Sequence, residues 1–128
     1  YRIYSGLVEL KHDVDSILLN LDTSIPCGLI VNELVSNALK YAFPQNRKGE
    51  VWVRLKETPT AILLTVSDNG VGLPENFDFR NSDSLGLQLV TSLVEQINGE
   101  IFCENKIGTK FTVTFKSGII KKTSDVKN

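Results

Sequence analysis

The chain has 128 residues, a mass of 14.2 kDa and 41% hydrophobic residues, which suits one domain built around one core. Fourteen Lys and Arg residues against fifteen Asp and Glu residues give a net charge of -1, so no overall basic field attracts nucleic acid or an anionic membrane. The two cysteines, Cys27 and Cys103, lack metal-binding spacing and are interpreted as small core residues of a reduced, intracellular protein.

The first clear pattern along the chain is the segment VDSILLNLD, which predicts a half-buried strand over residues 14–22. Residues 1–13 have no definite pattern and are interpreted as a linker from an upstream domain, with a short helix entering the domain as the alternative. The polar segment 117–128 is interpreted as a tail, which leaves residues 14–116 as the domain. The chain starts without Met, and we expect it to be part of a longer protein.

An amphipathic helix is predicted next. Thr23 or Ser24 is a suitable N-cap, Pro26 fits a first turn, and Pro44 prevents the helix from continuing. Apolar residues recur at helical spacing and define one buried face: Val31, Leu34, Val35, Ala38, Leu39 and Ala42.

Four polar residues fall on another face of this helix. Glu33 and Asn37 are four residues apart and point the same way, and their oxygen atoms suit a hard divalent cation. Lys40 offers a positive charge for phosphate, and Tyr41 offers a ring on which a base could stack. A solvated helix face is the alternative interpretation.

Two strands are predicted over residues 51–57 and 61–68, and the second ends in the motif DNGVG. A carboxylate at Asp68 can accept a hydrogen bond from the amino group of a purine such as adenine, and it disfavours a keto group at that position. Gly70 and Gly72 permit positive φ angles and close approach of a ligand to the backbone. An ordinary Asp-Asn-Gly turn is the alternative.

The last third of the chain contains a long polar loop, a helix over residues 84–98 that Gly99 stops, and strands over residues 100–105 and 109–115. Ser84 and Gly86 open the helix, where backbone amides are oriented to bind phosphate, and a plain serine N-cap at Ser84 is the alternative. Thr109 begins the last strand, from which its hydroxyl could reach a base. The order of elements predicts an α+β fold, a two-layer sandwich with both helices on one face of a mixed sheet.

Four segments occur in a fixed order: NELVSNALKYAF, DNGVG, SLGLQLV and GTKFTVTF. Together they resemble the ATP-binding catalytic domain of histidine kinases, in the superfamily that includes gyrase, Hsp90 and MutL. The segment LDTSIPCGLIVNELVSNALKYAFP is similar in sequence to the corresponding segment of the subgroup related to the HWE kinases. The resemblance spans about residues 14–115, and it implies the Bergerat ATP-binding fold with ATP and Mg²⁺ as ligands.

The resemblance also implies roles for single residues. Asn37 would ligate Mg²⁺, Lys40 would contact phosphate, and Tyr41 would line the adenine pocket. Asp68 would read the adenine amino group, with Thr109 nearby. The remaining nucleotide contacts are expected around the mobile loop and the start of the second helix, at Gly70, Gly72, Leu73, Ser84, Leu85, Gly86 and Leu87.

Two residues depart from the family pattern. Ser84 stands where the second glycine box normally begins with glycine, which makes the flexibility of the lid less certain. Glu33 stands where many histidine kinases carry Asn and where gyrase-like ATPases carry a water-activating Glu. A catalytic general base, a water-mediated metal ligand and a structural residue all remain open for Glu33.

The function implied is that of a two-component sensor histidine kinase, in which this domain transfers the γ-phosphate of Mg-ATP to a histidine on a separate dimerisation domain. His12 precedes the first predicted strand and is not expected to be that histidine. ATP or ADP, the dimerisation domain and a downstream response regulator are the expected partners. We expect the isolated domain to be monomeric and cytoplasmic, whether or not its parent is membrane-anchored.

Two alternatives come from other functional classes. One is a serine kinase of the anti-sigma-factor type, and the other is a non-catalytic module that binds a nucleotide or a partner protein. Within the main interpretation, residues 73–83 form a lid over the nucleotide. Phe77 and Phe79 either pack on the nucleotide when the lid closes or anchor the loop to the core.

Overall fold

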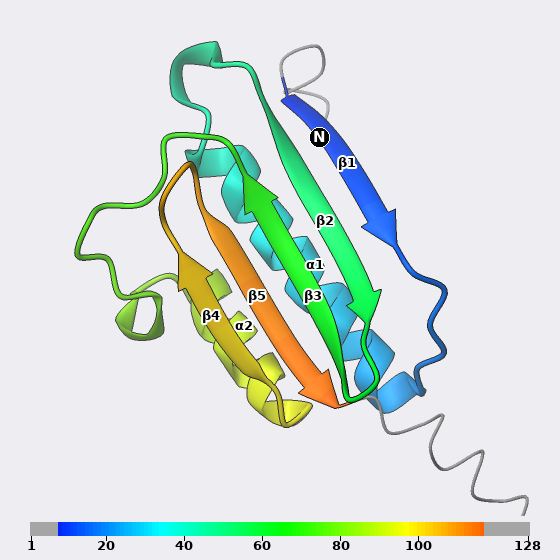
Figure 1. The fold of residues 1–128 in the computed structure, drawn as a ribbon. Helices are drawn as coiled ribbons and strands as arrows, with labels where there is room; N and C mark the ends of the chain where they lie inside the picture. Colours follow the sequence, from blue (N-terminus) through cyan, green and yellow to red (C-terminus); the bar gives the residue numbers. More distant parts are fainter. Residues whose placement is uncertain (1–7, 117–128) are drawn as a thin grey trace, which may run out of the picture.

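The computed structural model describes residues 8–116, apart from the side chain of Asn46. The order of elements is the predicted one, a strand, a helix and two strands followed by a helix and two strands, with two short 3-10 helices added (Figure 1). The elements are β1 (Val8–Val14), α1 (Leu21–Tyr41), η2 (Pro44–Asn46), β2 (Gly49–Glu57), β3 (Ala61–Asp68), η3 (Phe79–Asn81), α2 (Leu85–Gln96), β4 (Glu100–Glu104) and β5 (Lys110–Lys116).

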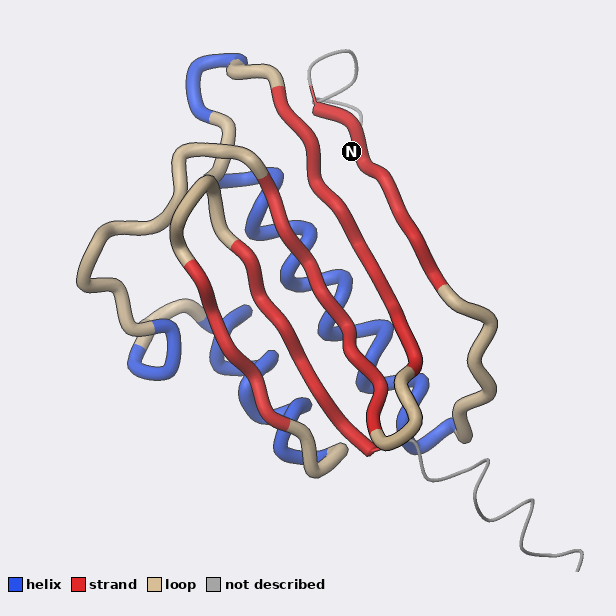
Figure 2. The backbone as a smooth tube through the Cα atoms, viewed as in Figure 1, coloured by secondary structure: helices blue, strands red, loops and turns tan. Residues whose placement is uncertain are grey.

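The strands form one five-stranded sheet in the order β1-β2-β3-β5-β4. β1 pairs with β2 in parallel, and every other pair is antiparallel, so the sheet is mixed. Both helices lie against the same face of the sheet, and no element of residues 8–116 covers the opposite face (Figures 1 and 2). The predicted α+β sandwich is therefore confirmed. No helix within residues 8–116 is long and apolar enough to cross a membrane.

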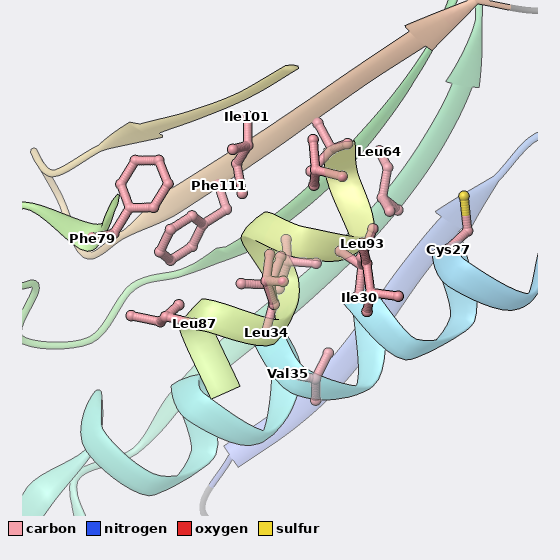
Figure 3. Close-up of a cluster of buried hydrophobic side chains, with 14 of the residues drawn as sticks. Cys27, Ile30, Leu34, Val35, Leu64, Phe79, Leu87, Leu93, Ile101 and Phe111 are labelled. Carbon is pink, nitrogen blue, oxygen red and sulfur yellow. The ribbon is translucent and has the colours of Figure 1, made fainter. Parts of the chain in front are cut away.

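The core fills the space between the sheet and the two helices. Side chains in a strand alternate between its two faces, so every second residue of β3 is buried on the helix side. Both helices add buried residues at helical spacing, and Figure 3 shows the resulting cluster. Its members include Ile30, Leu34, Val35, Ile62, Leu64, Val66, Leu87, Leu93, Ile101 and Phe111.

Both cysteines pack against this core. Cys27 is buried in α1, and Cys103 is partly buried in β4. Burial raises the pKa of each thiol to about 11, so both stay protonated at neutral pH. The interpretation of the two as small core residues agrees with these positions.

The strand predicted over residues 14–22 is wrong. The first strand is β1, Val8–Val14, and its parallel partner β2 aligns Val8 with Gly49 and Val14 with Leu55. Residues 8–13 thus belong to the sheet and not to a linker, while residues 1–7 and the predicted tail 117–128 lie outside the described part of the chain. The strand escaped prediction because most of its side chains are exposed, which removes the apolar alternation of a half-buried strand.

The predicted start of the first helix is also wrong. α1 begins at Leu21 and its N-cap is Asn20, whose side-chain oxygen accepts a hydrogen bond of 3.0 Å from the Thr23 amide. Pro26 consequently falls in the second turn and not the first. The helix ends at Tyr41, two residues before Phe43, the last residue ahead of Pro44 that the prediction included. The other predicted elements agree with the structure to within two residues at each end.

The N-cap assignment leads to a stability test. Asn20→Ala is expected to lower the free energy of unfolding by about 1 kcal/mol, because the Thr23 amide loses its acceptor. Ser24→Ala should leave stability unchanged or raise it slightly, since alanine has the higher helix propensity. Denaturant titration measures both, and a larger loss from Ser24→Ala would contradict the cap.

Candidate functional site

A cleft of about 390 Å³ opens at the end of the sheet where β3 ends and β5 begins. Its walls come from α1, β3, the loop that follows β3, the start of α2 and the start of β5. The lining residues are Leu34, Asn37, Ala38, Tyr41, Ala42, Val66, Asp68, Gly72, Leu73, Pro74, Phe77, Ser82, Ser84, Leu87, Thr109 and Phe111. The three predicted groups on α1, after β3 and at the start of β5 thus meet in one cavity.

Hydrogen bonds to the backbone hold the Asp68 carboxyl in place in the cleft. Its Oδ1 accepts hydrogen bonds from the Gly70 amide at 2.8 Å and from the Thr109 amide at 3.3 Å. Within residues 8–116 nothing donates to Oδ2, which leaves one oxygen for a ligand. Burial raises the pKa of the carboxyl, while those two hydrogen bonds and the charge of Arg47 oppose the rise.

The turn between β4 and β5 supports Asp68 from the other side. The Asp68 amide donates to the Thr109 carbonyl at 2.9 Å. Gly108 has a φ of 74°, and a Cβ there would overlap the Asp68 carbonyl oxygen, so only glycine fits. Thr109 is 7% exposed, and its hydroxyl has no hydrogen-bond partner within the described residues. Gly108 was not among the predicted site residues, although it is the first residue of the segment GTKFTVTF.

The two glycines after Asp68 have different roles. Gly72 lines the cleft and has a φ of 81°, as predicted. The positive φ expected for Gly70 is wrong, since Gly72 and Gly108 are the described glycines in that region. A Cβ on Gly70 would overlap the Ala42 carbonyl, which accepts a hydrogen bond of 2.9 Å from the Val71 amide. Gly70 therefore allows the loop to pack on the end of α1.

Asn69, between Asp68 and the first glycine, has a structural role that the sequence interpretation did not assign. Its Oδ1 accepts from the Glu50 amide at 2.8 Å, and its own amide donates to the Glu50 carbonyl at 3.3 Å. These two bonds fix the end of β3 against β2. The turn interpretation of the Asp-Asn-Gly tripeptide thus also holds for Asp68, whose Oδ1 accepts from the Gly70 amide two residues on, and the same residue lines the cleft.

The polar face of α1 contributes two of its four predicted residues to the cleft. Asn37 and Tyr41 line it, and the side-chain amide group of Asn37 has no hydrogen-bond partner within the described residues. Lys40 is exposed and does not line the cleft. Tyr41 is 68% exposed, so its ring lies at the rim. The helix thus provides one free amide group and one aromatic edge.

Glu33 lies against the start of α2 and not in the cleft wall. Its Oε1 is 2.6 Å from the position that a Cβ on Gly86 would take, so a larger residue at position 86 would displace the Glu33 carboxylate. Ser84 is the N-cap of α2, and its hydroxyl accepts from the Leu87 amide at 3.2 Å. Leu85 is exposed, Leu87 is buried in the cleft wall, and neither Gly86 nor Leu85 lines the cleft.

Two backbone amides at the start of α2 remain available for a ligand. Ser84 satisfies the amides of Leu87 and Gln88, but those of Leu85 and Gly86 have no partner within residues 8–116. Such unpaired amides, together with the helix dipole, favour an anion. The carboxylate of Glu33 beside them is also anionic, so a cation between it and a bound phosphate would reduce their repulsion.

The residues present fit a Mg²⁺ that is only partly bound by protein. No group of three or more His, Cys, Asp or Glu residues that could hold a metal exists within residues 8–116. Asn37 and Glu33 would supply one amide and one carboxylate oxygen, and both are partly buried. Mg²⁺ typically keeps several waters and uses one or two protein oxygens together with substrate phosphates.

The two phenylalanines of the loop are now distinguished. Phe79 is buried, and its ring meets Phe111 edge to face at 5.6 Å, so it anchors the loop to the core (Figure 3). Phe77 lines the cleft and is 37% exposed. Phe79 therefore anchors the loop to the core, and Phe77 is the residue that could pack on a ligand.

The apolar walls of the cleft were missed as site residues. They include Leu34, Ala38, Ala42, Val66 and Phe111. A signal existed for Val66, because it precedes Asp68 by two and strand residues at that spacing share a face. Likewise Leu34, Ala38 and Ala42 were predicted as one apolar helix face, and the structure divides that face between the core and the cleft.

Comparison with known proteins agrees with this geometry. Residues 23–119 match the family described as histidine kinase-, DNA gyrase B-, and HSP90-like ATPase. The chain belongs to this ATPase family. Sensor histidine kinase PdtaS of Mycobacterium tuberculosis is 36% identical over 86 residues, which cover 66% of this chain and 17% of that protein. Blue-light-activated histidine kinase 2 of Erythrobacter litoralis is 31% identical over 97 residues, covering 75% of this chain and 28% of the relative.

Solved structures show the same architecture. The blue-light-activated histidine kinase EL346 of Erythrobacter litoralis superposes with a TM-score of 0.86 at 27% identity, over 94% of this chain and 39% of that one. Histidine kinase AdeS of Acinetobacter baumannii gives a TM-score of 0.74 at 18% identity, over 91% of this chain and 57% of that one, which supports the fold alone. The predicted family is thus confirmed, and the chain spans a minor part of the curated relatives it matches.

A glycine pair tests how Asp68 is held. Gly108→Ala is expected to lower the free energy of unfolding by at least about 2 kcal/mol, because alanine disfavours the φ of 74° and its Cβ overlaps Asp68. Gly28→Ala is the matched control: it lies in α1 with no atom within 4 Å of the new Cβ, and should stabilise by about 0.5–1 kcal/mol. Equal effects in denaturant titrations would contradict the assigned role of Gly108.

Proposed function

We propose that this chain is the ATP-binding catalytic domain of a two-component sensor histidine kinase. The observation that carries the proposal is the Asp68 carboxyl, which is fixed through Oδ1 and presents Oδ2 in a largely apolar cleft. A fixed acceptor beside apolar walls suits a flat base that carries an exocyclic amino group. The family that the chain belongs to supports the same ligand class.

Adenine would lie between the apolar walls with its amino group toward Asp68. The Thr109 hydroxyl, unpaired and almost buried, is available to a ring nitrogen either directly or through water. Val66 and Ala38 supply apolar contact, and Phe77 can cover the base from the loop side. A keto group facing Oδ2 would place two acceptors opposite each other, so guanine should bind less well.

The triphosphate would extend toward the start of α2. The free amides of Leu85 and Gly86 favour an anion at that end. Lys40 lies outside the cleft lining, is exposed and is one helical turn from Asn37, and its positive charge would reach the phosphates from there. Asn37 would hold Mg²⁺ directly and Glu33 would do so through water. When bound, the ion would supply charge neutralisation along the phosphates. Glu33 is thereby proposed as a metal-site residue, and the general-base role is the alternative that its variant tests.

The phosphate acceptor would be a histidine on a separate dimerisation domain of the parent protein, from which a response regulator would receive the group. His12 does not suit this role, since it lies in β1 at the edge of the sheet and no residue of that strand lines the cleft. Catalysis by this chain would consist of positioning and electrostatic stabilisation of an in-line transfer. We also expect the isolated domain to be a monomer and its place in the cell to be the cytoplasm.

Asp68→Asn tests the adenine assignment. The asparagine can keep the bonds from Gly70 and Thr109 through its oxygen, while its amino group would face the amino group of adenine. ATP binding should weaken by about 1–3 kcal/mol, measured by calorimetry with Mg²⁺. Asp83→Asn, an exposed residue in the same loop, is the control and should bind as the wild type does. Unchanged ATP affinity in Asp68→Asn would show that the carboxyl does not read the base.

Glu33→Gln tests the metal role. In the wild type, Mg²⁺ should strengthen ATP binding, because it separates the Glu33 carboxylate from the phosphates. The neutral side chain should reduce this enhancement by about tenfold, with Glu95→Gln on the exposed side of α2 as control. The measurement is the ratio of ATP dissociation constants with and without Mg²⁺. The alternative is proton transfer by Glu33. It would be favoured if the ratio of dissociation constants were unchanged in Glu33→Gln while phosphotransfer to the separate dimerisation domain were lost at saturating Mg²⁺.

A further inference from the structure

We propose that Asn105 is a positioning residue for the nucleotide: it clamps the first residue of the lid and confines lid movement to residues 74–78. This inference rests on the proposed nucleotide site. Asn105 lies in the turn between β4 and β5 and does not line the cleft, so it would act through Leu73, which does.

The clamp consists of two reciprocal hydrogen bonds. The Leu73 amide donates to Asn105 Oδ1 at 2.8 Å, and Asn105 Nδ2 donates to the Leu73 carbonyl at 2.6 Å. The side-chain amide thus pairs with both backbone groups of Leu73, as a neighbouring strand would. This pairing fixes the direction in which the chain leaves Gly72 and enters the lid.

The fit around the clamp is close. A Cβ on Gly72 would lie 2.7 Å from Asn105 Oδ1 and would displace the clamping side chain, and the φ of 81° at this position also favours glycine. The same turn continues into Gly108 and Thr109, which hold Asp68. One turn of the chain therefore positions both the carboxyl proposed to read the base and the start of the loop proposed to cover it.

The far end of the lid is fixed on the same hairpin. Phe79 packs on Phe111 of β5, and Arg80 Nη2 donates to the Ile101 carbonyl of β4 at 2.7 Å. The Arg80 guanidinium also lies over the Phe79 ring, 4.6 Å from its centroid. These contacts make the second half of the predicted lid, residues 79–83, a poor candidate for large movement.

Between the two anchors lies the segment 74–78, whose residues are all exposed. Its hydrogen bonds within the described chain are local, such as the 3.0 Å bond from the Phe77 amide to the Pro74 carbonyl. Phe77 is the member of this segment that combines a large apolar side chain with a place in the cleft wall. A short loop held at both ends loses less conformational entropy when it orders on a ligand than a longer free loop does.

The exposure of Asn105 separates this role from simple structural support. Water competes for exposed hydrogen bonds, so the clamp should contribute little to global stability. Its loss should instead appear locally, as faster opening of the lid and faster release of nucleotide.

The experiment compares Asn105→Ala and Asn105→Asp with the exposed neighbour control Lys106→Ala. Binding and dissociation rates of ATP and ADP are measured by stopped-flow, amide hydrogen exchange is followed at Leu73, and stability is measured by denaturant titration. Asn105→Ala should weaken ATP binding about tenfold, mainly through faster dissociation, and Leu73 exchange should accelerate with almost no change in the unfolding midpoint. Asn105→Asp keeps the acceptor for the Leu73 amide and loses the donor, so Leu73 should stay partly protected while ATP affinity still falls.

Each result decides a different point. Wild-type dissociation rates in Asn105→Ala would overturn the positioning role, and unchanged exchange at Leu73 would overturn the clamp itself. A fall in the unfolding midpoint that matches the loss of affinity in both variants would make the residue structural. If the wild type does not bind ATP while Leu73 exchange still depends on Asn105, the proposed function fails and the clamp stands without its nucleotide role.

Discussion

The arrangement of the domain depends on keeping one half-buried carboxyl hydrogen-bonded at the end of a sheet. Asp68 cannot lie there unpaired, because removing a charged group from water without partners is costly. The amides of Gly70 and Thr109 meet that requirement. Each of them imposes a further condition: Gly70 must touch the end of α1, and the turn before Thr109 must pass close to Asp68 through Gly108. The orientation of a single side chain thus links a helix end, a strand end and a turn.

The contact between the two helices likewise determines where charged and polar groups lie. α1 and α2 share one face of the sheet, and the start of α2 comes close enough to α1 that Gly86 faces the Glu33 carboxylate. This contact places unpaired amides and a negative charge side by side. A carboxylate and free amides within one small region form a site whose electrostatics change strongly when a phosphate and a cation are added, which is why the role of Glu33 is tested through metal dependence.

Sequence patterns predicted those parts of the fold in which burial and periodicity coincide. The alternation in β3, the apolar face of α1 and the serine cap of α2 all agree with the structure. β1 was missed because an exposed edge strand has no apolar period and is fixed by its pairing with β2. The Asn20 cap was missed because Thr23 and Ser24 are equally suitable by residue type. Asn105 could not have been found from the sequence, since its partner Leu73 is 32 positions away along the chain.

The parallel pairing of β1 with β2 has a consequence for how this domain would operate within a longer chain. Val8 pairs with Gly49 and Val51 pairs with Asp68, so β1 starts at the end of the sheet that carries the cleft. A segment that enters β1 at Val8 therefore joins the domain at the cleft end of the sheet and not at the opposite end. For the acceptor domain proposed above, a connection at this end would raise the effective concentration of the acceptor at the cleft, which lets weak contacts between two domains suffice for repeated encounters.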